Sequence, residues 1–276
     1  MQPTIAQTSS QPATPITEPA TPLLQAQAIS RRFGGLLAVD EVSFDVQRGE
    51  ILTLIGPNGA GKSTVFNIIS RIYPQTSGRL EYRGEDLQSA AAHQIAWKGI
   101  ARTFQNIELF EHATVLQNLL IGHHTRTATG LMSHLLFLPE TRRQELAARA
   151  HVEQIIDFLS LQKYRDSMVA GLPYGVRKVV ELGRALCMQP ELLLLDEPSS
   201  GLNPEETDDL VFWIRDIVSE MNTTVMMVEH DMSLVNRVST RVVAMNQGRV
   251  IAVGSPEEVQ QHPEVVRAYL GTEEMP

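Results

Sequence analysis

The chain has one cysteine, few aromatic side chains and no excess of basic charge. The single cysteine, Cys187, excludes an internal disulfide framework and is typical of a protein kept in a reducing compartment. Basic residues number 23 and acidic residues 32, a balance that argues against nucleic-acid binding as the main task. Aromatics make up 5% of the chain and hydrophobic residues 43%, which favours an aliphatic α/β interior.

Long apolar runs are also missing. The longest, such as Leu192 to Leu195, fall far below the roughly 20 residues that a membrane-spanning helix needs. The amino terminus lacks the basic-plus-apolar layout of a signal peptide. Residues 1–22 are mostly Gln, Thr, Pro and Ala, which predicts a disordered tail, and residues 272–276 form a polar end. We therefore expect a soluble protein, cytosolic unless a partner holds it at a membrane.

A glycine-rich stretch lies between an apolar run, 51–55, and a helical pattern, 65–72. Strand, glycine-rich loop and helix are the context of a phosphate-binding loop, because glycines allow positive φ and bring backbone N–H groups close to a phosphate. Lys62 would place its charge on the β- and γ-phosphates, and Ser63 would offer its hydroxyl to Mg²⁺. The alternative, a chance glycine-rich turn, does not account for both flanks. The predicted nucleotide-binding residues are Gly56, Pro57, Asn58, Gly59, Ala60, Gly61, Lys62, Ser63 and Thr64.

Two carboxylates, Asp196 and Glu197, follow the apolar run 192–195. Open α/β sheets bind ligands at the carboxyl ends of their strands. Asp196 is therefore placed to orient Mg²⁺, and Glu197 is a candidate general base for an attacking water. The alternative is an ordinary solvated strand end, which the phosphate loop disfavours.

Two weaker signals complete the predicted site. The stretch 226–231 is predicted as a strand that ends in His230 and lies beside strand 191–195, so the imidazole could reach a γ-phosphate. Gln105 ends the stretch 99–105 and could touch metal or water through its amide. Either residue alone would be an ordinary packed or exposed side chain.

The chain pattern predicts a P-loop α/β core with an antiparallel β subdomain and an inserted helical subdomain. Strands are expected at 23–29 and 42–46 with a loop around Phe33 between them, and an edge strand with its turn is expected at 79–84. The helical subdomain is expected over about 87–175. Further on, we expect a helix after 172, strand 191–195, helix 204–220, strand 223–228, a hairpin at 246–248 and helices at 255–261 and 263–270.

The order of these motifs resembles the ATP-binding cassette of ABC transporters over residues 23–271. The resemblance implies ATP hydrolysis with Mg²⁺ bound by Ser63, Gln105 and Asp196, a γ-phosphate sensor at His230 and an adenine stacked on Phe33. It also implies a dimer with two ATP at the interface, in which the signature motif of one subunit completes the partner's site. That motif corresponds here to Leu172, Pro173, Tyr174 and Gly175.

Several short sequence motifs are similar to those of the LivG-type ATP-binding subunits of branched-chain amino-acid importers. These motifs are Arg32–Gly35, Arg102–Asn106, Leu172–Gly175, Gly201–Pro204 and Ala268–Gly271. The resemblance implies a second, similar ATPase, two transmembrane permease subunits, an indirect periplasmic binding protein and a place at the cytoplasmic face of the inner membrane. Two alternatives stay open: an ATPase for another small solute such as an amide or urea, and a regulatory or assembly protein that uses ATP as a dimerisation switch.

Two departures from the family pattern stand out. Pro173 replaces the usual signature serine, which loses a hydrogen bond to a charged group worth about 1.5–3 kcal/mol, so a weaker composite site is expected. Asn203 stands where an Asp is usual in the loop that contacts the partner. Arg177 and Lys178 are expected on a solvated helix face, and Cys187 in the core. The histidines near 123–134 fit no strong metal-binding spacing.

Overall fold

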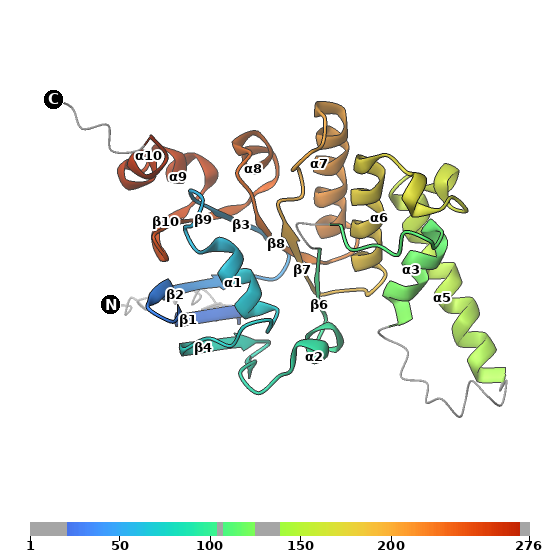
Figure 1. The fold of residues 1–276 in the computed structure, drawn as a ribbon, viewed down its shortest axis with the longest axis horizontal. Helices are drawn as coiled ribbons and strands as arrows, with labels where there is room; N and C mark the ends of the chain where they lie inside the picture. The colour runs from blue at the N-terminus through green and yellow to red at the C-terminus, as the bar shows by residue number, and fades with distance from the viewer. Residues whose placement is uncertain (1–20, 104–106, 125–138, 271–276) are drawn as a thin grey trace, which may run out of the picture.

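The computed structural model describes residues 21–103, 107–124 and 139–270 (Figure 1). Most of the expected tail, the predicted Gln105, part of the helical lobe and the polar end lie outside the described residues. Within the described ranges, none of the helices combines the length and the apolarity that a membrane crossing requires.

A six-stranded sheet forms the centre, with strand order β10-β9-β3-β8-β7-β6. Its strands are β3 (Ile51–Ile55), β6 (Ile100–Arg102), β7 (Leu192–Asp196), β8 (Thr224–Val228), β9 (Arg241–Asn246) and β10 (Arg249–Gly254). All neighbours are parallel except β9 and β10, which form the predicted hairpin. Because both strands are covered on both faces, β7 is apolar up to its last residue, Asp196, and β8 is apolar after its first residue, Thr224.

A second, antiparallel sheet has the order β2-β1-β4-β5. Its strands are β1 (Leu24–Phe33), β2 (Leu36–Val46), β4 (Ser77–Tyr82) and β5 (Glu85–Asp86). The first two are longer than predicted, since they extend to a two-residue turn at Gly34. The strand predicted at the edge is β4, but β5 takes that position, so β4 is an inner strand. This prediction was wrong because the two-residue β5 carries no apolar alternation.

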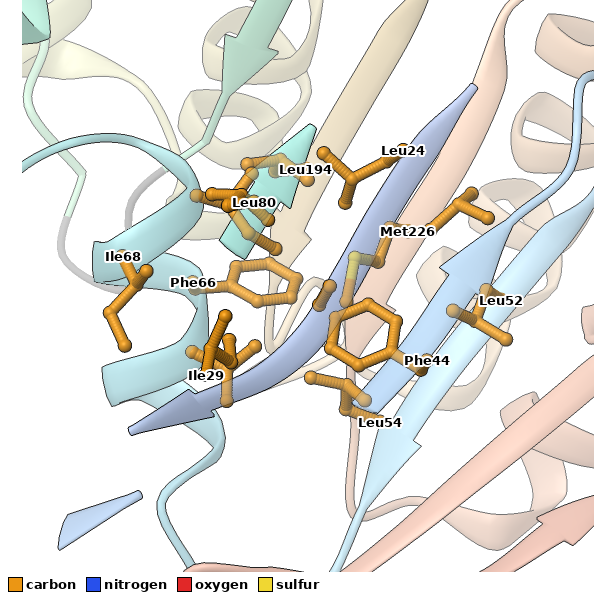
Figure 2. Close-up of a cluster of buried hydrophobic side chains, with 14 of the residues drawn as sticks. Leu24, Ile29, Phe44, Leu52, Leu54, Phe66, Ile68, Leu80, Leu194 and Met226 are labelled. Atoms are coloured by element: carbon orange, nitrogen blue, oxygen red, sulfur yellow. The ribbon is translucent and has the colours of Figure 1, made fainter. Parts of the chain in front are cut away.

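Helix α1 (Lys62–Ile69) packs between the two sheets. Figure 2 shows this core, in which side chains of α1, of the antiparallel sheet and of one face of the central sheet meet. Strand alternation assigns Leu194 and Met226 to this core, while their neighbours Leu193 and Met227 belong to the core on the other face.

Helices cover the opposite face and the far edge of the central sheet. They are α3 (Val115–His124), α5 (Pro139–Phe158), α6 (Tyr174–Leu186), α7 (Pro204–Ser219), α8 (Met232–Val238), α9 (Pro256–Gln261) and α10 (Pro263–Leu270), with 3₁₀ turns at Gln162–Tyr164 and Val169–Gly171. Figure 1 shows α3, α5 and α6 gathered at the end of the molecule away from β1 and β2. The expected α/β class and the two closing helices are confirmed. One strand was not expected: β6 follows α2 (Ala92–Trp97) inside the stretch predicted as helical, yet pairs with β7.

Candidate functional site

The glycine-rich loop joins the end of β3 to the start of α1, as predicted. Three of its glycines have positive φ, at 147° for Gly56, 80° for Gly59 and 98° for Gly61. Gly61 is the N-cap of α1 and lacks any side-chain cap. The first backbone N–H groups of the helix are therefore left without a side-chain acceptor, which favours an anion at this position.

Two of these glycines also lie against other backbone. A Cβ on Gly56 would lie 2.2 Å from the carbonyl oxygen of Met245, and a Cβ on Gly61 would lie 2.5 Å from that of Ala38. Both contacts are far inside van der Waals distance, so any larger residue would displace the loop from β2 and β9. The loop is thus shaped by its neighbours as well as by its own sequence.

The remaining residues of the loop differ in exposure. Asn58 and Ser63 are exposed, whereas Pro57 and Thr64 are partly covered and Ala60 is buried. Ser63 lies in the first turn of α1 and is exposed as a residue. These positions match a loop that wraps its backbone around a ligand at its exposed tip.

Lys62 is buried at the centre of the loop. Its Nζ donates to the carbonyl oxygens of Gly56 at 2.6 Å and Pro57 at 3.0 Å. Burial lowers the pKa of this ammonium, while the charges of Glu197 and Asp196 act in the opposite direction. The loop lysine and the two carboxylates at the end of β7 therefore belong to one electrostatic environment.

Asp196, the last residue of β7, is almost fully buried. Its Oδ2 accepts a 2.7 Å charged hydrogen bond from Nη2 of Arg102, a residue for which the sequence had suggested no role. Its Oδ1 is buried without a hydrogen-bond partner. A buried carboxylate oxygen left unpaired costs free energy, and a hard oxygen ligand is what Mg²⁺ prefers. The carboxylate thus fits a bound Mg²⁺ ion.

Glu197 follows in an unusual backbone conformation, with φ at 49°, which is rare for a residue other than glycine. Its N–H donates to the carbonyl oxygen of Val228 at 3.0 Å, and its own carbonyl oxygen accepts from Lys178 Nζ at 2.9 Å. The same ammonium also donates to the carbonyl oxygen of Pro198 at 3.2 Å. The prediction that Lys178 lies on a solvated face was wrong, because the chain folds back over it after β7.

His230 lies just beyond β8, beside the end of β7, as predicted. Its side chain is 60% exposed and so is accessible to a ligand. Its backbone N–H donates to Oε2 of Glu229 at 2.9 Å. Glu229 is fully buried and is a second residue that sequence reasoning missed. The available signal was a carboxylate placed directly after the apolar run 225–228.

The signature residues lie at the start of α6. Leu172 is buried, Pro173 and Tyr174 are exposed, and Gly175 is buried. Pro173 is the N-cap of the helix, which has no side-chain cap. With proline in place of serine, the helix therefore lacks a side-chain N-cap, and the signature lacks a hydroxyl.

The signature packs on the segment that follows Glu197. A Cβ on Gly201 would lie 2.7 Å from the ring of Tyr174, and a Cβ on Gly175 would lie 2.1 Å from Oε1 of Glu206. Asn203 is the N-cap of α7, where its side chain accepts from the N–H of Glu206. The α6 side chains pack in the core opposite the one that holds α1. Signature and phosphate loop thus belong to opposite faces of the sheet.

Phe33 ends β1, and its side chain is partly exposed. The Tyr73 ring meets it edge-on with centroids 5.2 Å apart, and the Arg31 guanidinium lies 4.6 Å from its centroid. Because 37% of the Phe33 surface is exposed, part of this side chain is accessible to a flat ring. Cys187, by contrast, is fully buried, as predicted, and Met226 and Met227 are also core residues.

Comparison with known proteins gives matches over most of the chain. Residues 39–200 match the family described as ABC transporter, and residues 249–274 match the branched-chain amino acid ATP-binding cassette transporter family. The branched-chain amino acid transport ATP-binding protein BraF of Pseudomonas aeruginosa is 41% identical over 91% of this chain and 98% of its own. The corresponding protein LivG of Salmonella typhimurium is 43% identical with the same coverage.

Solved structures agree. A nucleotide-free ATP-binding cassette from an ABC transporter superposes with a TM-score of 0.79 at 29% identity, covering 91% of this chain and 100% of the other. The ADP conformation of MJ1267, another such cassette, gives a TM-score of 0.78 at 29% identity with the same coverage. Together with the phosphate loop, the buried Asp196 and the strand order, these matches show that the chain belongs to the ABC transporter family and has the fold of its ATP-binding cassettes.

Proposed function

We propose that this chain is the ATP-hydrolysing subunit that powers uptake of branched-chain amino acids through separate permease subunits. The observation that carries the proposal is the extent of similarity: relatives named for branched-chain amino acid transport match at 41–43% identity over 98% of their length. The match of residues 249–274 to the branched-chain family extends it to the carboxyl end. The chain would act at the cytoplasmic face of the inner membrane, held there by its partners.

Each residue of the site has a chemical task in this proposal. Lys62 and the N–H groups of the loop hold the phosphates of ATP, and Phe33 stacks on adenine. Glu197 accepts a proton from the attacking water, and His230 contacts the γ-phosphate. Asp196, Ser63 and Gln105 would hold Mg²⁺, although Gln105 lies outside the described residues. Bound there, Mg²⁺ would neutralise charge on the phosphate oxygens.

The catalytic unit in this proposal is a dimer with a second, similar ATPase. Its support within the chain is the separation of the signature from the phosphate loop, since their helices pack on opposite faces of the sheet. One subunit's Pro173–Gly175 segment would then meet the phosphate held by the other. The exposed Pro173 and Tyr174 leave that surface open.

A groove suits the cytoplasmic end of a permease. It has a volume of about 370 Å³ and lies between α2, β6, α3 and α6, beside Arg102 at the end of β6. The half-exposed Ile72 and Ile121 line it. A helix docked there would touch the segment that leads to Gln105, so its movement would reach the Mg²⁺ site. A periplasmic binding protein would deliver the solute to the permease.

The test is transport by the reconstituted system. The chain, co-expressed with the permeases and second ATPase of its own genome neighbourhood, should drive ATP-dependent uptake of radiolabelled leucine in vesicles supplied with the binding protein. Unlabelled isoleucine and valine should compete, and urea and acetamide should not. Uptake of an amide instead of leucine would show that the proposed solute is wrong. The ATP hydrolysis should be inhibited by vanadate. Vesicles that hydrolyse no ATP would contradict the ATPase assignment and favour a regulatory role.

A further inference from the structure

The turn Glu197–Ser199 is held from two sides by two charged side chains, the partly buried Lys178 and the fully buried Glu229. On one side, Lys178 Nζ on α6 donates to the carbonyl oxygens of Glu197 and Pro198, at 2.9 and 3.2 Å. On the other side, Oε1 of Glu229 accepts the N–H of Ser199 at 2.9 Å. Lys178 Nζ and Glu229 Oε1 thus both bind main-chain atoms of the turn.

Glu229 also binds the segment that carries the γ-phosphate sensor. Its Oε2 accepts the N–H of His230 at 2.9 Å and that of Asp231 at 3.2 Å. The carboxylate is fully buried, so its two oxygens join the loop after β7 to the loop after β8. Glu229 thus adds to the main-chain bond from Glu197 N–H to the carbonyl oxygen of Val228 in fixing the relative position of Glu197 and His230.

Glu197 has a strained backbone conformation that contacts from the surrounding structure must stabilise. Its φ of 49° is a left-handed conformation, which a glutamate adopts only where surrounding contacts hold it. Without the two contacts, the main chain would relax towards negative φ and carry the side chain with it. Such over-determined strain is typical of catalytic positions.

We propose that Lys178 and Glu229 are positioning residues that hold the Glu197–Ser199 turn between them and so aim the Glu197 carboxylate at the attacking water. This inference rests on the proposed role of Glu197 as general base. Lys178 lies on the signature helix, so the same contact ties the signature presented to the partner to the base in this chain's own site. Movement of α6 would shift both together.

The test uses Glu229→Gln, Lys178→Met and the double variant of the full chain in the assembled transporter. The amide of Gln would turn an NH₂ group towards either the N–H of Ser199 or those of His230 and Asp231. We expect the ATP turnover number to fall at least tenfold in each single variant. The dissociation constant for ATP should stay within about twofold, since the phosphate loop is untouched. Because both act on one turn, the double variant should be no slower than the worse single one.

Matched controls separate positioning from general loosening. Glu50→Gln removes a carboxylate that also accepts a main-chain N–H, from Gln47, but at the opposite end of β3. Lys163→Met makes the same change as Lys178→Met on an exposed 3₁₀ turn. Both should keep the parent's turnover, and Lys178→Arg, which keeps donors at this position, should recover most of it.

Hydrogen–deuterium exchange of the isolated full chain supplies a readout that needs no activity. In Glu229→Gln, exchange should rise in peptides covering 197–203 and 229–232 and stay unchanged in the phosphate loop. Unaltered turnover, additive losses in the double variant, or exchange raised throughout the chain would overturn the proposal. A parent transporter without ATP turnover would instead refute the proposed function, and exchange alone would then decide whether the turn is held as described.

Discussion

Arg102 and Asp196 form a buried ion pair, with Nη2 2.7 Å from Oδ2 and side-chain exposures of only 10% and 4%. Arg102 also donates to the side chains of Asn67 at 2.8 Å and Ser70 at 3.1 Å, so it is fixed to α1 as well. Together with Lys62, this guanidinium supplies positive charge near the carboxylate expected to hold Mg²⁺. The pair therefore links the end of β6 to the metal site.

Removing that guanidinium should destabilise the nucleotide-free protein. Arg102→Met leaves a buried, uncompensated carboxylate, and we expect a loss of about 3 kcal/mol in the free energy of unfolding. Urea denaturation measures it. Saturating Mg²⁺ and ADP should reduce the loss, since they restore positive charge at Asp196. Arg149→Met, which breaks an exposed pair with Glu145, should cost under about 1 kcal/mol. Equal losses in the two variants would contradict the prediction.

Glu197→Gln tests the general base. The isosteric amide keeps the backbone contacts of the turn but cannot take a proton, so turnover should fall at least about 100-fold. The dissociation constant for ATP should be unchanged, and ATP with Mg²⁺ should trap a closed dimer that size-exclusion chromatography resolves. Glu220→Gln, at the exposed end of α7, is the control and should keep parental turnover. An active Glu197→Gln variant would remove Glu197 from the role of base.

Pro173→Ser should have two separable effects. A serine at the N-cap of α6 can accept an N–H of the first turn, which should raise the free energy of unfolding of the isolated chain by about 0.5–2 kcal/mol. In the assembled transporter the hydroxyl should also raise ATP turnover, as a hydrogen bond to phosphate is regained. Pro173→Ala is the control, because it removes the proline without adding a hydroxyl. Equal turnover in the serine and alanine variants would show that the hydroxyl plays no part.

Phe33→Ala should weaken nucleotide binding without changing chemistry. Stacking of a base on an aromatic side chain is worth about 1–3 kcal/mol, so the dissociation constant for ATP should rise roughly 5- to 150-fold. Turnover at saturating ATP should stay close to that of the parent. Phe33→Trp should bind at least as well, and Leu36→Ala, at an exposed apolar position across the turn, is the control. Unchanged binding by Phe33→Ala would place adenine elsewhere.

Cys187 should be unreactive in the folded protein. Burial raises the pKa of its thiol to about 12, so almost no thiolate is present at pH 9. A chromogenic disulfide reagent should label no thiol in the native chain and one in urea. Because the unfolded thiol ionises near pH 9, the contribution of this group to stability is complete below that pH and is lost as the pH rises towards 12. Rapid native labelling would contradict the buried position.

Local sequence was sufficient for the elements whose chemistry is local. The phosphate loop needs glycines at positive φ followed by a helix, and the apolar runs of β7 and β8 can be satisfied only inside a covered sheet. The hairpin at 246–248 has Gly248 at its turn, both closing helices begin with a proline, and α9 also has Ser255 as its N-cap. These parts of the fold could therefore be predicted from the chain alone.

Contacts between distant segments were decided only by the tertiary structure. Nothing near Arg102 in the chain indicates that it faces Asp196, 94 positions away. Lys178 and Glu229 are likewise a polar helix residue and a strand-end carboxylate until the fold brings both to the turn after Glu197. The reason is physical: propensity and periodicity act over a few residues, whereas the partner of a buried charge is fixed by which strands lie side by side.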